Sequence, residues 1–131
     1  MKKMMLFLSL AVSLILSVCT YAAEKESVKI AVASTGKTTS DAVSNLAARC
    51  PYYLVFDGTG NLIEAISNPY RDTARRAGPS AAHFLAAKGV TTVVAEKIGI
   101  KMINALKGKG VSHFEFRGHV DQAVNKVLEL K

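Results

Sequence analysis

The stretch from residue 49 to residue 68 constrains the fold more than any other part of the chain. Two apolar runs, residues 52–56 and 62–66, flank residues 57–60 (Asp-Gly-Thr-Gly), an order that is typical of a β-hairpin. The first run is apolar almost throughout, as a strand covered on both faces of a sheet would be. The stretch therefore predicts an antiparallel ribbon whose first strand lies inside a covered sheet.

The N-terminus has the pattern of a secretory signal peptide. Positive charge at Lys2 and Lys3 precedes residues 6–18, an uninterrupted run of apolar and small side chains. As a helix this run would span about 20 Å, too short for a hydrocarbon core of about 30 Å. Because small side chains follow and favour cleavage after Ala22, we predict a leader over residues 1–22 and a mature domain over residues 23–131.

An uncleaved anchor is the alternative that remains open for this segment, and a lipoprotein is discounted. An uncleaved anchor would keep the apolar run, and a lipoprotein would use Cys19, although Val18 is bulky where a small residue is wanted. With cleavage, the protein is exported, periplasmic or secreted, and has no further membrane contact. Cys50 is then the only thiol, which excludes an internal disulfide.

The charge balance points to an anionic partner. Removing Lys2 and Lys3 with the leader lowers the net charge from +7 to +5, which still favours negative ligands. No run of Lys and Arg is dense enough to indicate a nucleic-acid-binding arm, so we expect no nucleic acid among the partners.

Strands and helices alternate over the mature domain. Residues 28–33 have the alternation of a strand, and Ser40 or Asp41 is expected to cap a short helix that carries Leu46. The hairpin follows, and apolar periodicity then predicts helices over 79–88, 98–106 and 120–128 and strands over 90–95 and 111–116. This order predicts an α/β three-layer sandwich with a mixed five-stranded sheet.

The predicted topology brings several loops to one edge of the sheet. The hairpin and right-handed crossovers place the ends of four strands beside the start of the strand that follows Cys50. Open α/β sheets bind ligands at this carboxyl edge. We expect a basic rim there, formed by Lys37, Arg49, Arg71, Arg75, Arg76, Lys97 and Arg117.

Cys50, His119 and His83 are the predicted metal ligands. Arg49 beside Cys50 is expected to lower the pKa of the thiol and so favour the thiolate, a soft metal ligand. His119 precedes the last helix, whose dipole keeps an imidazole neutral, and His83 lies in the first turns of its helix. Inert packing of Cys50 and a capping role for His119 remain open. One thiolate cannot complete a four-cysteine cluster site, so a cluster would need histidines, other ligands or a second subunit.

Two enzymatic functions fit the sequence poorly, and we expect no catalysis. Residues 35–38 (Thr-Gly-Lys-Thr) resemble the end of a phosphate-binding loop, but Ala31 stands where the first glycine is required. A nuclease would need clustered carboxylates for two metal ions, and the acidic residues are scattered over different elements. The loop amides around Gly36 and Lys37 can still bind an anion.

A series of short motifs, ordered along nearly the whole mature chain, resembles a known family. They are residues 29–34 (Lys-Ile-Ala-Val-Ala-Ser), residues 49–57 (Arg-Cys-Pro-Tyr-Tyr-Leu-Val-Phe-Asp), Asn68-Pro69, residues 88–90, Gly99, Ala105-Leu106, residues 118–120 (Gly-His-Val) and Ala123-Val124. In order and spacing they resemble the dinitrogenase iron–molybdenum cofactor biosynthesis family. The resemblance implies a ribonuclease H-like fold and the binding or delivery of an iron–sulfur-type metallocluster.

The chain departs from the family pattern in two places. Residues 46–48 (Leu-Ala-Ala) replace the His-Phe-Gly that precedes Arg-Cys-Pro in nitrogenase-linked members, so one histidine ligand is missing. The glycine-rich loop after Asn68-Pro69 is reduced to Ala77-Gly78, which arginines precede. Both departures argue against a direct role in nitrogenase assembly.

Two functions follow from these patterns. The first is an exported protein that binds an iron–sulfur or iron–molybdenum type cluster or another metal cofactor, in a carrier or insertion role, with a recipient metalloprotein or a homodimer as further partners. Its predicted cofactor-binding residues are Gly36, Lys37, Arg49, Arg75, Arg76 and Arg117, and its predicted metal ligands are Cys50, His119 and His83. The alternative is a non-metal interaction module that binds a protein partner or a small anion at the same basic rim.

Overall fold

The computed structural model describes residues 28–130. Its elements, in chain order, are β1 (Lys29–Ser34), β2 (Tyr52–Asp57), β3 (Leu62–Ser67), α2 (Ala77–Ala87), β4 (Thr92–Ala95), α3 (Ile100–Gly108), β5 (Ser112–Glu115) and α4 (Val120–Glu129). The predicted leader, residues 1–22, lies outside the described residues. Between residues 28 and 130, no helix has the length and apolar character needed to cross a membrane.

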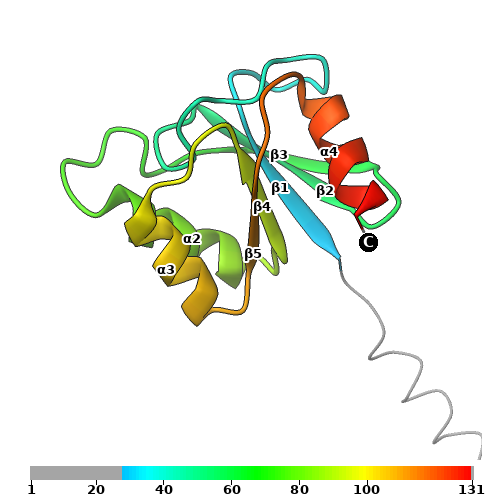
Figure 1. The fold of residues 1–131 in the computed structure, drawn as a ribbon. Helices are drawn as coiled ribbons and strands as arrows, with labels where there is room; N and C mark the ends of the chain where they lie inside the picture. Colours follow the sequence, from blue (N-terminus) through cyan, green and yellow to red (C-terminus); the bar gives the residue numbers. More distant parts are fainter. Residues whose placement is uncertain (1–27, 131) are drawn as a thin grey trace, which may run out of the picture.

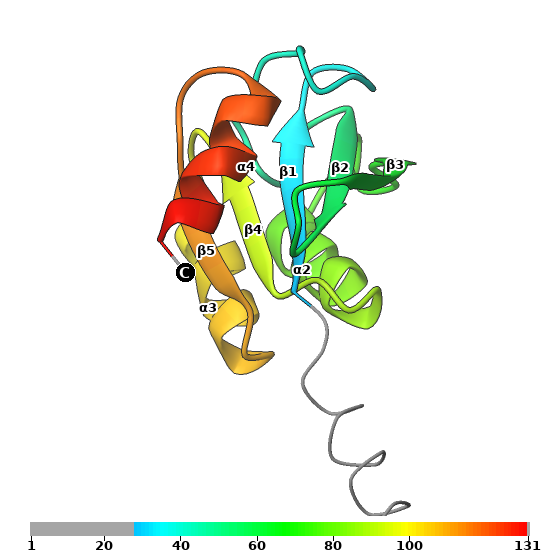
Figure 2. The same ribbon diagram turned by 90° about the vertical axis from the view of Figure 1, so that its right-hand side faces the viewer.

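The five strands form one mixed sheet in the order β3-β2-β1-β4-β5, as Figures 1 and 2 show. Strand β2 is antiparallel to both β1 and β3, whereas β4 is parallel to both β1 and β5. In the register, Val55 of β2 lies between Ala31 of β1 and Glu64 of β3. The predicted hairpin and the mixed five-stranded sheet are confirmed.

The side chain of Asp57 closes the turn between β2 and β3. Its Oδ1 accepts hydrogen bonds from the hydroxyl of Thr59 at 2.6 Å and from the amides of Thr59 and Asn61 at 2.9 and 3.0 Å. Gly60 takes a positive φ of 89°, which glycine adopts without a steric penalty. The Asp-Gly-Thr-Gly pattern therefore specifies the turn through both a side-chain acceptor and a left-handed position.

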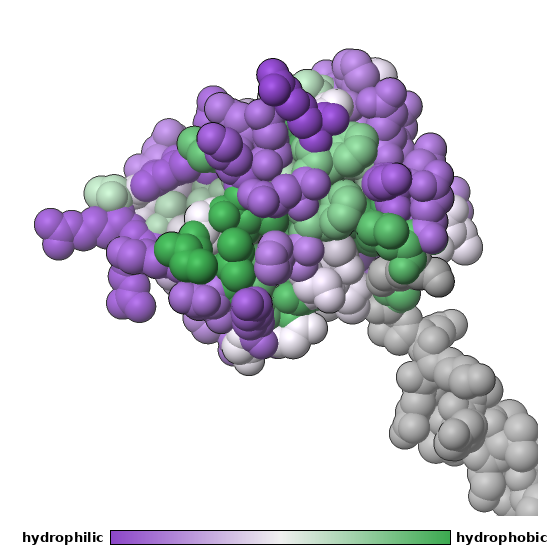
Figure 3. Space-filling view, viewed as in Figure 1, coloured by the Kyte–Doolittle hydropathy of each residue, from purple (hydrophilic) through white to green (hydrophobic). Residues whose placement is uncertain are grey.

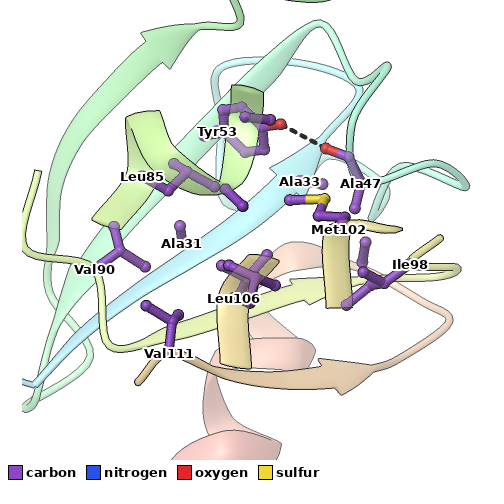
Figure 4. Packing of buried hydrophobic residues seen from close by; sticks show 14 of the residues in the cluster. Ala31, Ala33, Ala47, Tyr53, Leu85, Val90, Ile98, Met102, Leu106 and Val111 are labelled. Atoms are coloured by element: carbon purple, nitrogen blue, oxygen red, sulfur yellow. Dashed lines mark hydrogen bonds between the residues drawn. The ribbon is translucent and has the colours of Figure 1, made fainter. Parts of the chain in front are cut away.

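Helices cover both faces of the sheet and make three layers (Figures 1 and 2). On one face, α2 and α3 pack over a core that includes Ala31, Tyr53 and Leu106, part of which Figure 4 shows. On the other face, α4 packs over a core that includes Ile30 and Leu54. Successive residues of β1 and of β2 thus point to opposite cores, because side chains alternate along a strand. The α/β architecture is confirmed, and the ribonuclease H-like assignment stays a prediction.

The helix predicted after Ser40 or Asp41 is wrong. The carboxylate of Asp41 instead accepts hydrogen bonds from the amide and the hydroxyl of Thr38, both at 2.8 Å, which closes a local turn. Farther on, the amide of Val43 bonds the carbonyl of Gly118 at 2.8 Å, so the backbone pairs with neighbouring loops. Residues 35–50 are therefore one irregular connection, because local side-chain acceptors and tertiary pairing outweigh a weak helical preference.

Candidate functional site

The loops at the carboxyl edge of the sheet meet as the topology predicts, but the 35–50 connection divides this edge into two sides. Its first half bonds the start of α4, where the amide of Val120 donates to the carbonyl of Asp41 at 2.9 Å. Its second half bonds the loop after β4, where the amide of Ala47 donates to the carbonyl of Lys97 at 3.1 Å. We refer to these as the α4 side and the α2/α3 side.

A cavity of about 400 Å³ opens on the α2/α3 side. Three segments line it: residues 46–49 of the connection, residues 76–79 at the start of α2, and Lys97 with residues 99–102 at the start of α3. On this side of the molecule, Figure 3 shows apolar side chains lying among hydrophilic ones. We call this cavity the α2/α3 pocket.

The starts of α2 and α3 come close together because Gly78 has no side chain. A Cβ atom at Gly78 would lie only 3.2 Å from the Cβ of Met102 in α3. The first amides of a helix have no acceptor within that helix, and they give its N-terminus a partial positive charge. Both of these N-termini line the pocket. Neither has a side-chain cap or an acidic residue in its first turn.

Four cationic side chains line the same pocket: Arg49, Arg76, Lys97 and Lys101. No acidic residue belongs to the lining formed by the described residues. Positive side chains and open helix N-termini both favour negative ligands. The α2/α3 pocket is therefore suited to an anion.

Arg76 holds an unusual backbone conformation at the mouth of the pocket. It precedes α2 with φ 61° and ψ 28°, in the left-handed region, and it is the only non-glycine residue between 28 and 130 with a positive φ. This conformation costs an arginine about 1 kcal/mol, because its Cβ approaches the following carbonyl. Strained positions of this kind cluster at functional sites.

Arg49 and Asn68 join two segments beside the pocket. The Nη1 of Arg49 donates to the carbonyl of Arg71 at 3.2 Å and also to the carbonyl of Thr73. The buried Asn68 side chain donates to the carbonyls of Ala48 and Cys50 at 2.9 and 3.0 Å. These bonds tie the loop that leads into α2 to residues 48–50. Asn68-Pro69, noted in the sequence only as part of the family motif, thus has a structural role.

Cys50 lies in the core beneath the pocket, fully buried. Burial raises the pKa of its thiol to about 11, and the neighbouring polar groups, Tyr53 first among them, only partly offset this effect. The prediction of a lowered pKa is wrong, because Arg49 turns to the 71–73 carbonyls and the sulfur is removed from solvent. A ligand role for Cys50 stays a prediction, and it would require the segment above the sulfur to open.

The carbonyl of Ala47 accepts hydrogen bonds from two buried side chains of this core. The hydroxyl of Tyr53 donates to it at 2.6 Å, a bond drawn in Figure 4, and the thiol of Cys50 donates to it at 3.5 Å. Burial also raises the pKa of Tyr53 far above its ordinary value, with the adjacent Cys50 contributing. Both groups therefore stay protonated donors and fix the backbone of residue 47, which lines the pocket.

The two predicted histidine ligands lie elsewhere. His119 is exposed on the α4 side, where its Nδ1 lies 3.0 Å from the carbonyl of Ser40 and its amide donates to Oε1 of Gln122 at 3.1 Å. His83 is exposed on α2, whose buried positions are Ala77, Ala81, Ala82 and Leu85. Within residues 28–130, no group of three or more His, Cys, Asp or Glu side chains is placed to hold a metal ion. The three predicted ligands thus do not form one cluster.

The other residues of the predicted rim lie outside the pocket lining. Lys37 lies over the ring of Tyr52 at 5.4 Å, and Arg117 pairs with Glu96 at 3.9 Å. The amide of Gly36 donates to Oγ of Ser34 at 3.2 Å, so it is already occupied. Arg75 is exposed next to Arg76 but does not line the pocket.

Lys101 is a pocket residue that the sequence patterns did not reveal. The sequence predicts that this helix begins near Ile98, which would place Lys101 after the first turn of the helix. In the structure, Gly99 is the N-cap, so Lys101 lies in the first turn of α3 and lines the pocket. The available signal was Gly99 itself, since glycine is tolerated at an N-cap and disfavoured inside a helix.

Comparison with models of known protein families identifies the family of this chain. The model of the family described as dinitrogenase iron-molybdenum cofactor matches residues 28–130. The chain belongs to the dinitrogenase iron–molybdenum cofactor family. The predicted resemblance is therefore confirmed.

Solved structures of other proteins resemble this family member along most of their length. An NMR structure of a NifB-like protein from Thermotoga has 31% identity and a TM-score of 0.67, covering 79% of this chain and 89% of the other. The apo form of the orange protein from Desulfovibrio gigas has 26% identity and a TM-score of 0.73, with the same coverage of 79% and 89%. A dinitrogenase-like protein from Methanocaldococcus jannaschii, at 16% identity, TM-score 0.56 and coverage of 77% and 88%, supports the fold alone. A comparison with curated proteins gave no significant match.

Proposed function

We propose that this family member binds an anionic metallocluster of the iron–sulfur or iron–molybdenum type in the α2/α3 pocket, as a carrier or insertion protein. One observation carries the proposal. In a cavity of about 400 Å³, two uncapped helix N-termini and four cationic side chains converge, with no acidic residue in the lining that the described residues form. Membership of the family supplies the class of ligand.

The groups present fit an anion held by charge and hydrogen bonds. Amide N–H groups and the cations Arg76, Lys97 and Lys101 can neutralise and orient the outer atoms of a negative cluster. A cage of coordinating side chains does not fit, because Cys50 is buried and protonated. Over the described residues, a group of three or more metal-ligating side chains is also lacking. The proposal therefore needs no metal–sulfur bond to the protein.

Apolar side chains in the lining would strengthen this binding. Leu46, Ile100 and Met102 all line the pocket, and a ligand that covers them displaces water from the charged groups beside them. Charges interact more strongly where water is excluded, because the local dielectric constant falls. A large anion that fills the pocket would gain from both effects, whereas a small hydrated ion would not.

The direct test is anaerobic reconstitution with iron and sulfide, with and without molybdate, followed by absorption spectroscopy and metal analysis. We expect the wild type to load and the Lys97→Ala/Lys101→Ala variant to load at least about tenfold less at limiting metal. The matched control is Lys107→Ala/Lys109→Ala, which removes the same charge at the opposite end of α3. Cys50→Ala should load like the wild type. Negligible loading of the wild type overturns the cluster proposal.

A specific observation also supports the second function, a non-metal interaction module without catalytic activity. Leu46 is 46% exposed and Ile100 is 68% exposed at the pocket, and exposed apolar side chains that are grouped and rimmed by polar residues mark interaction sites. This alternative predicts that Arg76→Ala abolishes binding of an acidic protein or a small anion while no metal is bound. Metal analysis of the purified protein separates the two functions.

We also propose that the protein is exported, as the leader pattern of residues 1–22 predicts. A recipient metalloprotein would then have to be reached outside the cytoplasm. Mass spectrometry of the protein after expression of the full chain tests this point. A mature N-terminus at Ala23 supports export, and an intact N-terminus in all fractions contradicts it.

A further inference from the structure

Two arginines line the α2/α3 pocket, but their contacts differ. The Nη1 of Arg49 is occupied by protein acceptors, the carbonyls of Arg71 and Thr73. Arg76 is exposed, and within residues 28–130 its side chain has no hydrogen bond and no ion pair. Arg76 is therefore free to contact a ligand, whereas the contacts of Arg49 are with the loop before α2.

The loop between β3 and α2 is held at two points by one segment. At its start, Asn68 donates to the carbonyls of Ala48 and Cys50. In its middle, Arg49 bonds the carbonyl of Thr73, three residues before Arg76. Within the loop, the amide of Thr73 donates to the carbonyl of Tyr70 at 3.2 Å, which adds a local turn. Residues 48–50 thus fix the path by which the chain reaches Arg76.

The fixed path of the loop matters because Arg76 has a left-handed backbone conformation. A glycine would adopt φ 61° without strain, but an arginine keeps it only where the surrounding structure imposes it. The Arg49 bonds to residues 71 and 73 are the nearest side-chain contacts along the chain that impose the path of this loop. Loss of these bonds would let residue 76 relax and would turn its side chain away from the pocket.

We propose that Arg49 is a positioning residue that acts through Arg76: Arg49 fixes the loop before α2, and Arg76 contacts the anion. This inference rests on the proposed function for its ligand, but the fixing of the loop can be measured without any ligand. It also revises the sequence-based prediction that Arg49 and Arg76 are equivalent cofactor-binding residues.

The first experiment uses hydrogen exchange on the ligand-free full chain. Arg49→Lys keeps the charge, but it replaces the planar guanidinium, whose Nη1 bonds both carbonyls, by a shorter side chain that ends in a tetrahedral ammonium. We expect the amides of Thr73 and Ser80, which donate to the carbonyls of Tyr70 and Arg76, to exchange at least about tenfold faster in Arg49→Lys and Arg49→Ala. The control is Arg117→Lys: within residues 28–130 the ion pair of Arg117 is with Glu96 alone, and exchange at Thr73 and Ser80 in this variant should match the wild type. Unchanged exchange in both Arg49 variants overturns the proposal.

The second experiment is a double-mutant cycle with tetrathiomolybdate, a dianion of molybdenum and sulfur, as the probe. We expect Arg49→Lys and Arg76→Gly each to weaken binding by about tenfold, and the double variant to bind no worse than Arg76→Gly. Arg76→Gly should also unfold at a higher temperature than the wild type, a combination that a purely structural role of Arg76 would not give. Additive losses, or wild-type affinity in Arg49→Lys, overturn the proposal. If the wild type does not bind the probe, the proposed binding of a molybdenum–sulfur anion fails, and hydrogen exchange alone decides whether Arg49 fixes the loop.

Discussion

The helices α2, α3 and α4 all begin along the same edge of the sheet. The first amides of α4 have hydrogen-bond acceptors, whereas the starts of α2 and α3 are left open. At α4, the amides of Val120 and Asp121 donate to carbonyls of the 35–50 connection, and the amide of Gln122 donates to a carboxylate oxygen of Asp121, all at 2.9 Å. At α2 and α3 there is no side-chain cap and no acidic residue in the first turn. The α4 start is completed by its own chain, and the other two starts are left open beside four cations. The α4 side thus stabilises the fold, and the open starts of α2 and α3 support the proposed binding of an external anion on the α2/α3 side.

Reversing the charge of basic residues should give the largest difference in anion binding between the α2/α3 side and the rest of the rim. We expect Lys97→Glu/Lys101→Glu to weaken tetrathiomolybdate binding by about a hundredfold, because both cations line the pocket. The matched change on the rest of the rim, Lys37→Glu/Arg117→Glu, should weaken binding by less than about threefold. Titration calorimetry at two salt concentrations measures both. Equal losses would mean that the undivided basic rim, and not the pocket, binds the anion.

The core around Cys50 should make the protein less stable at alkaline pH. The thiol of Cys50 has a folded-state pKa of about 11 against an ordinary value of 9.0. Between these pH values the unfolded chain loses its proton first, so the free energy of unfolding should fall by about 2 kcal/mol as pH rises from 9 to 11. Urea unfolding of the wild type and of Cys50→Ala measures this slope. An unchanged slope in Cys50→Ala would contradict the buried, protonated thiol.

A new cap should make the start of α3 resemble that of α4. Gly99 is the N-cap of α3 in an extended conformation, and a Cβ there would meet nothing within 4 Å. We expect Gly99→Asp to stabilise the fold by roughly a few tenths of a kcal/mol, since aspartate is a slightly better N-cap than glycine, and to weaken anion binding. Thermal unfolding and calorimetry measure the two effects. Gly108→Asp, at the other end of α3, is the control, and stronger binding in Gly99→Asp would contradict the open N-terminus.

The smallest expected effect is on the α4 side, at Asp41. Hydrogen bonds from Thr38 lower the pKa of this carboxyl below 3.8. Its contribution is therefore present above the ordinary pKa and is lost as pH falls through the lowered value. Because the group is exposed, we expect only a slight loss of stability in acid, removed in Asp41→Asn, and no change in anion binding at pH 7. A marked loss of binding in Asp41→Asn would show that the α4 side contributes to the site.

Much of the fold could be predicted from residue patterns because those patterns are local. The Asp-Gly-Thr-Gly turn, the apolar run of β2 and the stripe of α4 each specify one element, and handedness rules then bring the loop ends to one edge. The order of short motifs was sufficient to indicate the family. The helix predicted within the 35–50 connection was wrong because the hydrogen bonds of this segment go to residues far away in sequence, such as Gly118 and Lys97.

The candidate site was predicted only in part, for a related reason. Arg49, Arg76 and Lys97 belong to the expected rim and line the pocket. The residues next to them in sequence do not show in which direction each side chain points. Arg49 next to Cys50 suggested a thiolate, whereas Arg49 bonds the loop before α2 and the sulfur lies in the core. The division of the edge follows from tertiary hydrogen bonds that no short pattern contains.

The most direct test is to follow backbone amide signals by NMR while tetrathiomolybdate is added to the protein. The account predicts the largest shifts at residues 77, 78 and 100–102, the open first amides of α2 and α3. Residues 120–122, whose amides already have acceptors, should change little. Largest shifts at residues 36–41 and 118–122, with none at the starts of α2 and α3, would contradict it.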